Sequence, residues 1–205
     1  MPLGGIPLIQ RTVKAAINSE MFKRIVVSTD SQEIADCAIG AGAEIPFMRS
    51  AALSSSSANS VDVALDALGK VGDCQSFALL QPTSPFLNVL HLQEAAELFE
   101  TGDGAFVVSV VTGKPLEWCY VQDSHGYIQP GIGDFPKVFR RQDAKEVVYP
   151  NGAIYIADSR TFRSKRSFFT DQTVGYKMNK IDSIDIDMLE DFNLAEALIS
   201  SGLRE

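Results

Sequence analysis

The stretch Arg24–Gly40, RIVVSTDSQEIADCAIG, decides the fold class of this chain. It begins with the apolar run Ile25–Val27, which is typical of a strand buried on both faces of a sheet. Asp30, with Glu33 three residues later, predicts the start of a helix, because such a pair can accept hydrogen bonds from the amides that a helix start leaves unpaired. The glycine at position 40 predicts the end of that helix. The stretch is therefore predicted to be one strand followed by one helix.

The same alternation continues on both sides of this stretch. Apolar residues at helical spacing predict helices over 7–19, 61–68, 89–100 and 188–201, and apolar runs predict strands at 45–47, 76–80, 105–110 and 153–157. Alternating strands and helices indicate crossover connections, so the fold class is predicted to be α/β with a mostly parallel, Rossmann-like sheet. The inward face of the last helix is expected to carry Leu189, Phe192, Ala195 and Ile199.

The alternation breaks over residues 114–150. Trp118–Val121 and Tyr127–Ile128 predict a hairpin that turns at Asp123–Gly126, and the remainder is irregular and rich in Arg, Asp and Pro. We interpret this region as an insertion for dimer contacts within a single domain spanning residues 1–205.

Composition excludes several classes of protein. The chain has 205 residues and a net charge of −8, which disfavours broad nucleic-acid binding because that needs a basic face. No run of eighteen apolar residues predicts a membrane span, and the start of the chain has no signal-peptide pattern. The three cysteines are widely spaced, which argues against a disulfide framework or a zinc site. We expect a cytoplasmic protein.

Two carboxylates near the end of the chain are candidate metal ligands. Asp185 and Asp187 are two residues apart, so in an extended segment they project from one face. Proteins often hold Mg²⁺ with one or two carboxylates, and phosphate oxygens complete the octahedron. The alternative is that Asp187 caps the last helix together with Glu190, and that Asp185 is merely solvated.

Other candidates follow predicted strands, where an open α/β sheet binds its ligands. Gln81 could bind sugar hydroxyls or simply form a turn with Pro82. Arg140 and Arg141 could be a solvated pair or could bind a carboxylate or phosphate through two parallel hydrogen bonds. The two histidines lie near no nucleophile motif, so a hydrolase with a catalytic triad is disfavoured.

Six strings, in order and spread over nearly the whole chain, resemble the acylneuraminate cytidylyltransferases, also called CMP-sialic acid synthetases. They are PLGG with PLI at 2–9, IVVSTD at 25–30, LLQPTSP at 79–85, RRQD at 140–143, PNGAIYI at 150–156 and SIDID at 183–187. Each string alone is common, but their shared order is a specific signal.

The resemblance implies a Mg²⁺-dependent transfer of CMP from CTP to the anomeric hydroxyl of an acidic nine-carbon sugar, by a homodimer. It assigns the metal to Asp185 and Asp187, and catalysis to Asp185 with Arg141, which would hold the sugar carboxylate. It gives the sugar and acyl pocket to Gln81, Asn151, Tyr155, Phe168, Phe169 and Gln142, and the nucleotide to Arg49 and Ser60. Pro82–Thr83 favours nine-carbon sugars, because ketodeoxyoctonate enzymes have an acidic residue just after the glutamine.

Some features depart from the family pattern. Family members carry an apolar strand and a phosphate-binding loop just before the segment matched by Pro2–Gly5. Ser56 stands at a position where family members usually have Asp. Leu87–Asn88 stands where a Leu-Arg pair is common in the family. Two hypotheses follow: a working transferase, or a non-catalytic dimer that binds sugar or nucleotide. A dehydrogenase is disfavoured, because no G-x-G-x-x-G lies between a strand and a helix.

Overall fold

The computed structural model of the chain describes residues 2–55, 57–134, 140, 142 and 144–204. The helices are α1 Leu8–Asn18, α2 Gln32–Gly40, α3 Ser60–Val71, α4 Val89–Thr101, α5 Ser159–Lys165 and α6 Leu189–Ser200, with short 3-10 turns at Ala51–Leu53 and Leu116–Trp118. The strands are β1 Pro2–Leu3, β2 Ile6–Pro7, β3 Ser76–Leu80, β4 Phe106–Thr112, β5 Tyr120–Gln122, β6 Ile128–Pro130, β7 Val148–Asp158 and β8 Thr173–Met178. The predicted strand at 76–80 and the predicted helices are confirmed to within about two residues at most of their ends.

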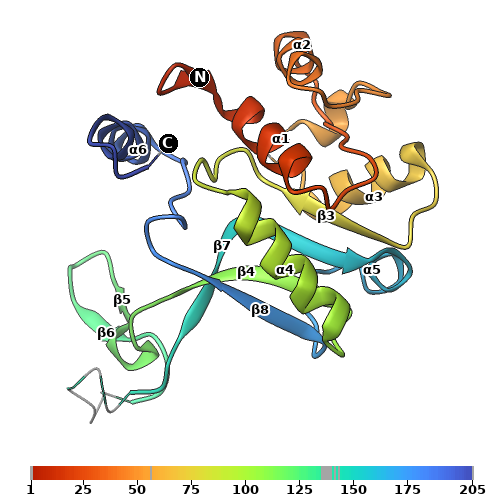
Figure 1. The fold of residues 1–205 in the computed structure, drawn as a ribbon. Helices are drawn as coiled ribbons and strands as arrows, with labels where there is room; N and C mark the ends of the chain where they lie inside the picture. The colour runs from red at the N-terminus through yellow and green to blue at the C-terminus, as the bar shows by residue number, and fades with distance from the viewer. Residues whose placement is uncertain (1, 56, 135–139, 141, 143, 205) are drawn as a thin grey trace.

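A four-stranded sheet in the order β3-β7-β4-β8 forms the centre of the molecule. Strands β4 and β8 are parallel, whereas β7 runs antiparallel to both β3 and β4. Strands β3, β4 and β8 therefore share one direction, which confirms the α/β class with a mostly parallel sheet. Figure 1 shows α4 lying across one face of the sheet.

Both faces of the sheet are covered, and this explains why β4 reads as a continuous apolar run. Val107 packs in a cluster with residues of α1 and α4, while Phe106 and Val108 pack in a second cluster with residues of α3 and α5. Phe106, Val107 and Val108 are at most 1% exposed. A strand without an exposed face has no place for polar alternation.

The predicted strands at 24–28 and 45–47 are wrong as full strands. In the structure, the two parts of the chain meet in a single parallel bridge, between Val26 and Glu44, the residue just before the second predicted strand. The amide of Val27 donates to the Glu44 carbonyl at 3.0 Å, and the amide of Glu44 donates to the Ile25 carbonyl at 2.8 Å. Because only one residue pair meets, no ladder extends, and Ile25–Val27 is half-buried rather than fully buried.

Two predictions about helix ends are also wrong. Ser31, not Asp30, caps α2, because its hydroxyl accepts the amide of Ile34, while Asp30 pairs with Arg49. Leu189 is 65% exposed instead of facing inward. It lies in the first turn of α6, before the helix reaches the cluster where Phe192, Ala195 and Ile199 pack.

The predicted hairpin in the 114–150 region is confirmed as β5 and β6. One carboxylate oxygen of Asp123 accepts the amides of His125 and Tyr127, which fixes the turn. In Figure 1 this hairpin projects away from the central sheet. Its role in dimer contacts, and the single-domain organisation, stay predictions. No helix in the described part of the chain is long and apolar enough to cross a membrane.

Candidate active site

One edge of the sheet gathers most of the residues singled out in the sequence. There β3, β4 and β8 end at their carboxyl ends, and β7 begins. Gln81 follows β3, and the loop at 179–188 follows β8 and leads into α6. Ligands of open α/β sheets collect at this kind of edge. The sheet topology therefore supplies the site.

Asp185 and Gln81 meet across the backbone of Gly152. A Cβ atom built on Gly152 would lie 3.1 Å from Oδ2 of Asp185 and 3.1 Å from Oε1 of Gln81. Gly152 has a φ of +84°, a backbone conformation that side chains other than glycine rarely adopt. The absence of a side chain in the middle of β7 thus lets both oxygen-bearing groups approach the strand.

The carboxylate of Asp185 is held in a partly dry position. Its Oδ1 atom is buried and has no hydrogen-bond partner among the residues described. Burial raises the pKa of Asp185, the charges of Asp187 and Asp191 raise it further, and the side chain of Thr83 acts in the opposite direction. An unsatisfied anionic oxygen near other carboxylates is a position that a cation would stabilise.

The backbone on either side of Asp185 is fixed. The amide of Ile186 donates to the carbonyl of Thr83 at 2.8 Å, which ties the 179–188 loop to the turn after β3. Ile184 and Ile186 pack with Leu3 and Phe86 in the cluster beneath α6. This alternation of packed isoleucines leaves Asp185 on the opposite face of the segment, as the spacing predicted.

Asp187 does not cap α6, so that alternative is wrong. The carboxylate of Asp191 accepts the amides of Asp187 and Met188 at 3.2 and 2.9 Å, and therefore satisfies the helix start. Asp187 is exposed, and its own carboxylate is not needed for the cap. No group of three or more His, Cys, Asp or Glu residues within the described ranges could hold a metal. A carboxylate pair suits Mg²⁺, which keeps waters and substrate phosphates as its other ligands.

Asn151 is 5% exposed, and its amide group is engaged inside the protein. Its Oδ1 accepts the hydroxyl of Ser109 at 2.5 Å, and its Nδ2 donates to the Ser183 hydroxyl at 2.9 Å. Ser183 belongs to the 179–188 loop, so Asn151 connects β7 to that loop. Its predicted contact with the sugar stays a prediction.

Tyr155 lies in β7 beside two phenylalanines. Its ring centroid is 5.0 Å from that of Phe168 and 6.4 Å from that of Phe169. Phe168 is buried in the α3–α5 cluster, whereas Phe169 is 55% exposed. Burial raises the pKa of the Tyr155 hydroxyl, and the charge of Asp185 adds to this effect. The pair Tyr155 and Phe169 can therefore line an apolar part of the site.

The remaining predicted residues are Arg49, Ser60, Gln142 and Arg141. Arg49 donates to Ser54 at 3.0 Å and to Asp30 at 3.3 Å, and Ser60 is the exposed first residue of α3. Gln142 is exposed, and Arg141 lies outside the described residues. Their assignments to nucleotide and sugar stay predictions.

A hollow of about 440 Å³ borders the 179–188 loop. Its lining includes Lys114 after β4, Tyr149 at the start of β7, and Lys180 and Ser183 from the loop. The two lysines give this hollow positive charge next to an otherwise acidic loop.

Sequence reasoning missed Gly152, Thr83 and Ser183 as parts of the site. Gly152 carried a usable signal, because a glycine inside a strand often marks a close approach by another group. Thr83 and Ser183 carried none, since their contacts depend on segments about 100 and about 30 residues away in the chain.

Two solved structures share the fold of this chain. A solved CMP:2-keto-3-deoxy-manno-octonic acid synthetase complexed with CTP matches with a TM-score of 0.69 over 98% of this chain and 91% of that one, at 11% identity. A 4-diphosphocytidyl-2C-methyl-D-erythritol synthase from Anaerococcus prevotii matches with a TM-score of 0.68 over 97% and 88%, at 12% identity. At such low identity these likenesses show the fold alone.

The chain belongs to the cytidylyltransferase family, which matches residues 1–198. It is 40% identical over 194 residues to the N-acylneuraminate cytidylyltransferase of Streptococcus agalactiae serotype V, covering 93% of this chain and 46% of that protein. It is 35% identical over 204 residues to the CMP-N,N'-diacetyllegionaminic acid synthase of Legionella pneumophila, covering 96% and 87%. The chain thus spans about half the length of the streptococcal relative. The resemblance drawn from the six strings is confirmed.

Proposed function

We propose that this chain transfers CMP from CTP to the anomeric hydroxyl of a sialic-acid-like nonulosonic acid and releases pyrophosphate. One observation carries the proposal: Oδ2 of Asp185 lies with Gln81 against the bare backbone of Gly152, while Oδ1 of the same carboxylate is buried without a hydrogen-bond partner among the described residues. A carboxylate that could hold a cation beside an amide that could bind sugar hydroxyls supports this reaction. The names of the streptococcal and Legionella relatives, and the family match, support the same reaction.

The reaction needs alignment and charge neutralisation more than covalent chemistry by the protein. The anomeric hydroxyl gives up its proton to solvent as its oxygen forms a bond to the α-phosphorus of CTP. The bond from that phosphorus to the bridging oxygen breaks, and pyrophosphate leaves with the electron pair. Gln81 orients the sugar through its hydroxyls. Asp185 would act on the phosphates through the cation that it holds, because a carboxylate cannot itself balance their negative charge.

Asp185 and Asp187 would hold Mg²⁺ in this proposal, and the bound ion would neutralise the developing charge on the phosphates. The donor set fits this ion, because two carboxylates leave room for phosphate and water oxygens. Asp187 is available for this role because Asp191 caps α6 in its place.

The acidic sugar would lie between the aromatic pair Tyr155 and Phe169 and the hollow lined by the two lysines. Tyr155 and the exposed ring of Phe169 offer an apolar surface for an acyl group. Lys114 and Lys180 line this hollow and make that side of the site attractive to an anionic substrate. Arg141, by family resemblance, would bind the sugar carboxylate.

We also propose that the chain works as a homodimer in the cytoplasm. The hairpin and its surroundings expose several large apolar side chains, namely Leu116, Trp118, Tyr120, Val121, Tyr127, Ile128 and Ile132. A concentration of exposed aromatic residues on a projecting hairpin is typical of an interaction surface. The three free cysteines fit a reducing compartment. Light scattering on wild type and on a Tyr127→Ser, Ile128→Ser double variant tests the dimer, which the double variant is expected to lose.

The reaction is tested by following pyrophosphate release from CTP with a panel of acidic sugars. Turnover is expected with nine-carbon acylated sugar acids in the presence of Mg²⁺, and chelation of the metal should abolish it. Tight binding of CTP or sugar without any turnover would instead support the non-catalytic alternative. Lack of both binding and turnover would contradict the proposal.

A further inference from the structure

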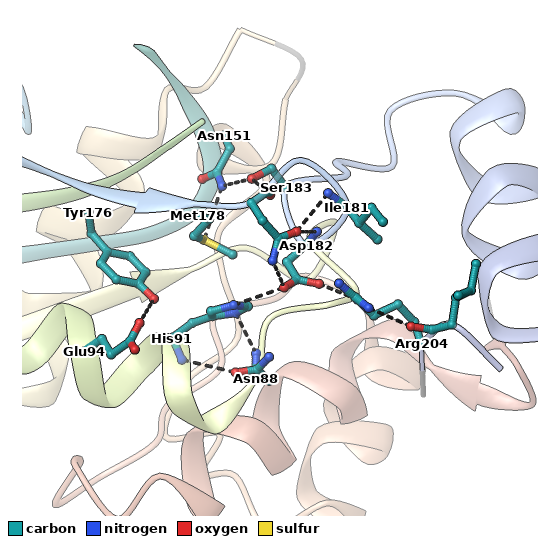
Figure 2. Close-up of polar contacts among 12 residues, drawn as sticks. Asn88, His91, Glu94, Asn151, Tyr176, Met178, Ile181, Asp182, Ser183 and Arg204 are labelled. Atoms are coloured by element: carbon teal, nitrogen blue, oxygen red, sulfur yellow. Dashed lines mark hydrogen bonds and ion pairs between the residues drawn. The ribbon is translucent and has the colours of Figure 1, made fainter. Parts of the chain in front are cut away.

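The loop that carries Asp185 is built around a buried carboxylate of its own, Asp182. This residue is 5% exposed, although it lies in the turn that follows β8. A buried carboxylate is costly unless hydrogen bonds and opposite charges surround it. Figure 2 shows how the groups that satisfy Asp182 converge on it from separate parts of the chain.

Three side chains satisfy Asp182. Nε of Arg204, at the end of the described chain, donates to Oδ1 at 2.5 Å. On the other oxygen, Nδ2 of Asn179 donates at 2.5 Å, and Nε2 of His91 lies at 3.3 Å. The other ring nitrogen of His91 accepts the amide of Asn88 at 3.4 Å, so the proton is assigned to Nε2, which donates to Asp182. Asp182 therefore joins the loop to α4 and to the segment after α6.

The turn itself is closed by Asn179. Its side-chain oxygen accepts the amides of Ile181 and Asp182 at 3.0 and 2.9 Å. The hydroxyl of Ser183 donates to the Asn179 carbonyl at 2.6 Å, and the same hydroxyl accepts from Asn151. The Ser183 hydroxyl is thus tied to Asn151 of β7 and to the carbonyl of Asn179, whose side chain in turn donates to Asp182.

We propose that Asp182, held by Arg204, is a positioning residue for the carboxylate of Asp185. The inference rests on the proposed function, because it takes Asp185 as a ligand for a divalent cation. Asp182 itself is enclosed by its partners. Its effect on Asp185 passes through Ser183 and Ile184, the two residues that join them. Residues that orient metal ligands in this way typically change metal affinity when they are replaced.

The Arg204 contact offers a way to test positioning without touching the site. Arg204→Ala removes the guanidinium and leaves every ligand in place. Arg24→Ala is a matched control, because Arg24 forms a similarly close ion pair, at 2.7 Å to Glu44, on the α1–α2 side of the molecule. Two quantities are measured: the Mg²⁺ concentration that gives half-maximal pyrophosphate release, and Mn²⁺ binding in the presence of CTP, followed by electron paramagnetic resonance.

The Arg204→Ala protein is expected to need about tenfold more Mg²⁺ and to bind Mn²⁺ about tenfold more weakly, while its rate at saturating metal stays near wild type. Arg24→Ala should change neither quantity. Should Arg204→Ala fail to fold, Arg204→Gln, which keeps a donor but not the charge, is expected to show the same shift at smaller size.

Unchanged metal dependence in a folded Arg204 variant, or an equal shift in Arg24→Ala, would overturn the inference. If the proposed function itself is wrong, the Asp185→Asn variant is expected to bind Mn²⁺ as tightly as the wild type. The two ideas are therefore separable in one set of titrations.

Discussion

Gly152 lies directly against Asp185, with only 3.1 Å between Oδ2 of the carboxylate and the position that a Cβ of residue 152 would occupy. Carbon and oxygen atoms in ordinary contact are farther apart than this, so any side chain on Gly152 would push the carboxylate away. The glycine in the middle of β7 thus serves both the backbone, which has a φ of +84° there, and the close approach of Asp185.

Gly152→Ala is expected to weaken both folding and metal-dependent activity. The φ of +84° makes alanine strained there by about 1–3 kcal/mol, and the new methyl group would displace Asp185. Gly72→Ala is the matched control, because Gly72 has a φ of +97° and open space around its Cβ position. Both variants should lose thermal stability, and only Gly152→Ala should need more Mg²⁺. Equal activity in the two variants would refute the close approach as a functional feature.

Asp185→Asn is expected to abolish CMP transfer without unfolding the protein. Asparagine keeps the shape of the side chain, and removing the charge relieves the repulsion from Asp187 and Asp191. The melting temperature should therefore hold or rise while pyrophosphate release falls by about 100-fold or more. Full turnover at saturating Mg²⁺ would contradict the assignment of Asp185 to the metal.

Arg141→Lys is expected to raise the KM for the acidic sugar more than the KM for CTP. A lysine carries the charge but cannot form the two parallel hydrogen bonds that a guanidinium makes to a carboxylate. Arg140→Lys, one residue earlier in the chain, is the control. An equal rise in both KM values would assign Arg141 to the nucleotide or to the fold.

The protein is expected to lose stability in mild acid because of the buried His91. Burial lowers the pKa of His91 below its usual 6.5, and repulsion from Arg204 lowers it further. Attraction to Asp182 and Glu94 acts in the opposite direction but does not cancel the effect of burial. The unfolded chain then binds the proton more readily than the folded one. This contribution to stability is fully present above pH 6.5 and is lost as the pH falls below that value toward the folded pKa.

Denaturant titrations between pH 7.5 and 5 check this prediction. His91→Gln should flatten the pH dependence of the free energy of unfolding, whereas His125→Gln in the exposed hairpin turn should not. A wild-type stability that is constant over this range would show that the protonated imidazole is accommodated in the folded state.

Local patterns predicted the elements whose identity depends on neighbours in the sequence. The apolar run Ser76–Leu80 and the turn at Asp123–Gly126 were enough to place β3 and the hairpin, because their side chains decide their own conformation. The spacing of Asp185 and Asp187 predicted that Ile184 and Ile186 pack on the opposite face of their segment, which the structure confirms, whereas the metal role of the two carboxylates stays a prediction.

The parts that sequence missed depend on partners far along the chain. Strand β8 has a weak pattern, with Gly175 in its middle, and becomes a strand because β4 pairs with it along its whole length. The reversed direction of β7, the single Val26–Glu44 bridge and the burial of Asp182 are likewise set by packing between distant segments. Propensity does not encode such pairings.

The pairing of β3 with β7 also determines when the protein can acquire its shape as it is made. Strand β3 ends at Leu80, and its partner begins at Val148. At typical synthesis rates the ribosome needs several seconds or more to make the residues between them. The apolar strand Ser76–Leu80 is therefore made well before its neighbour in the sheet, and until β7 arrives it can pack only against elements made earlier, such as α1 and α3.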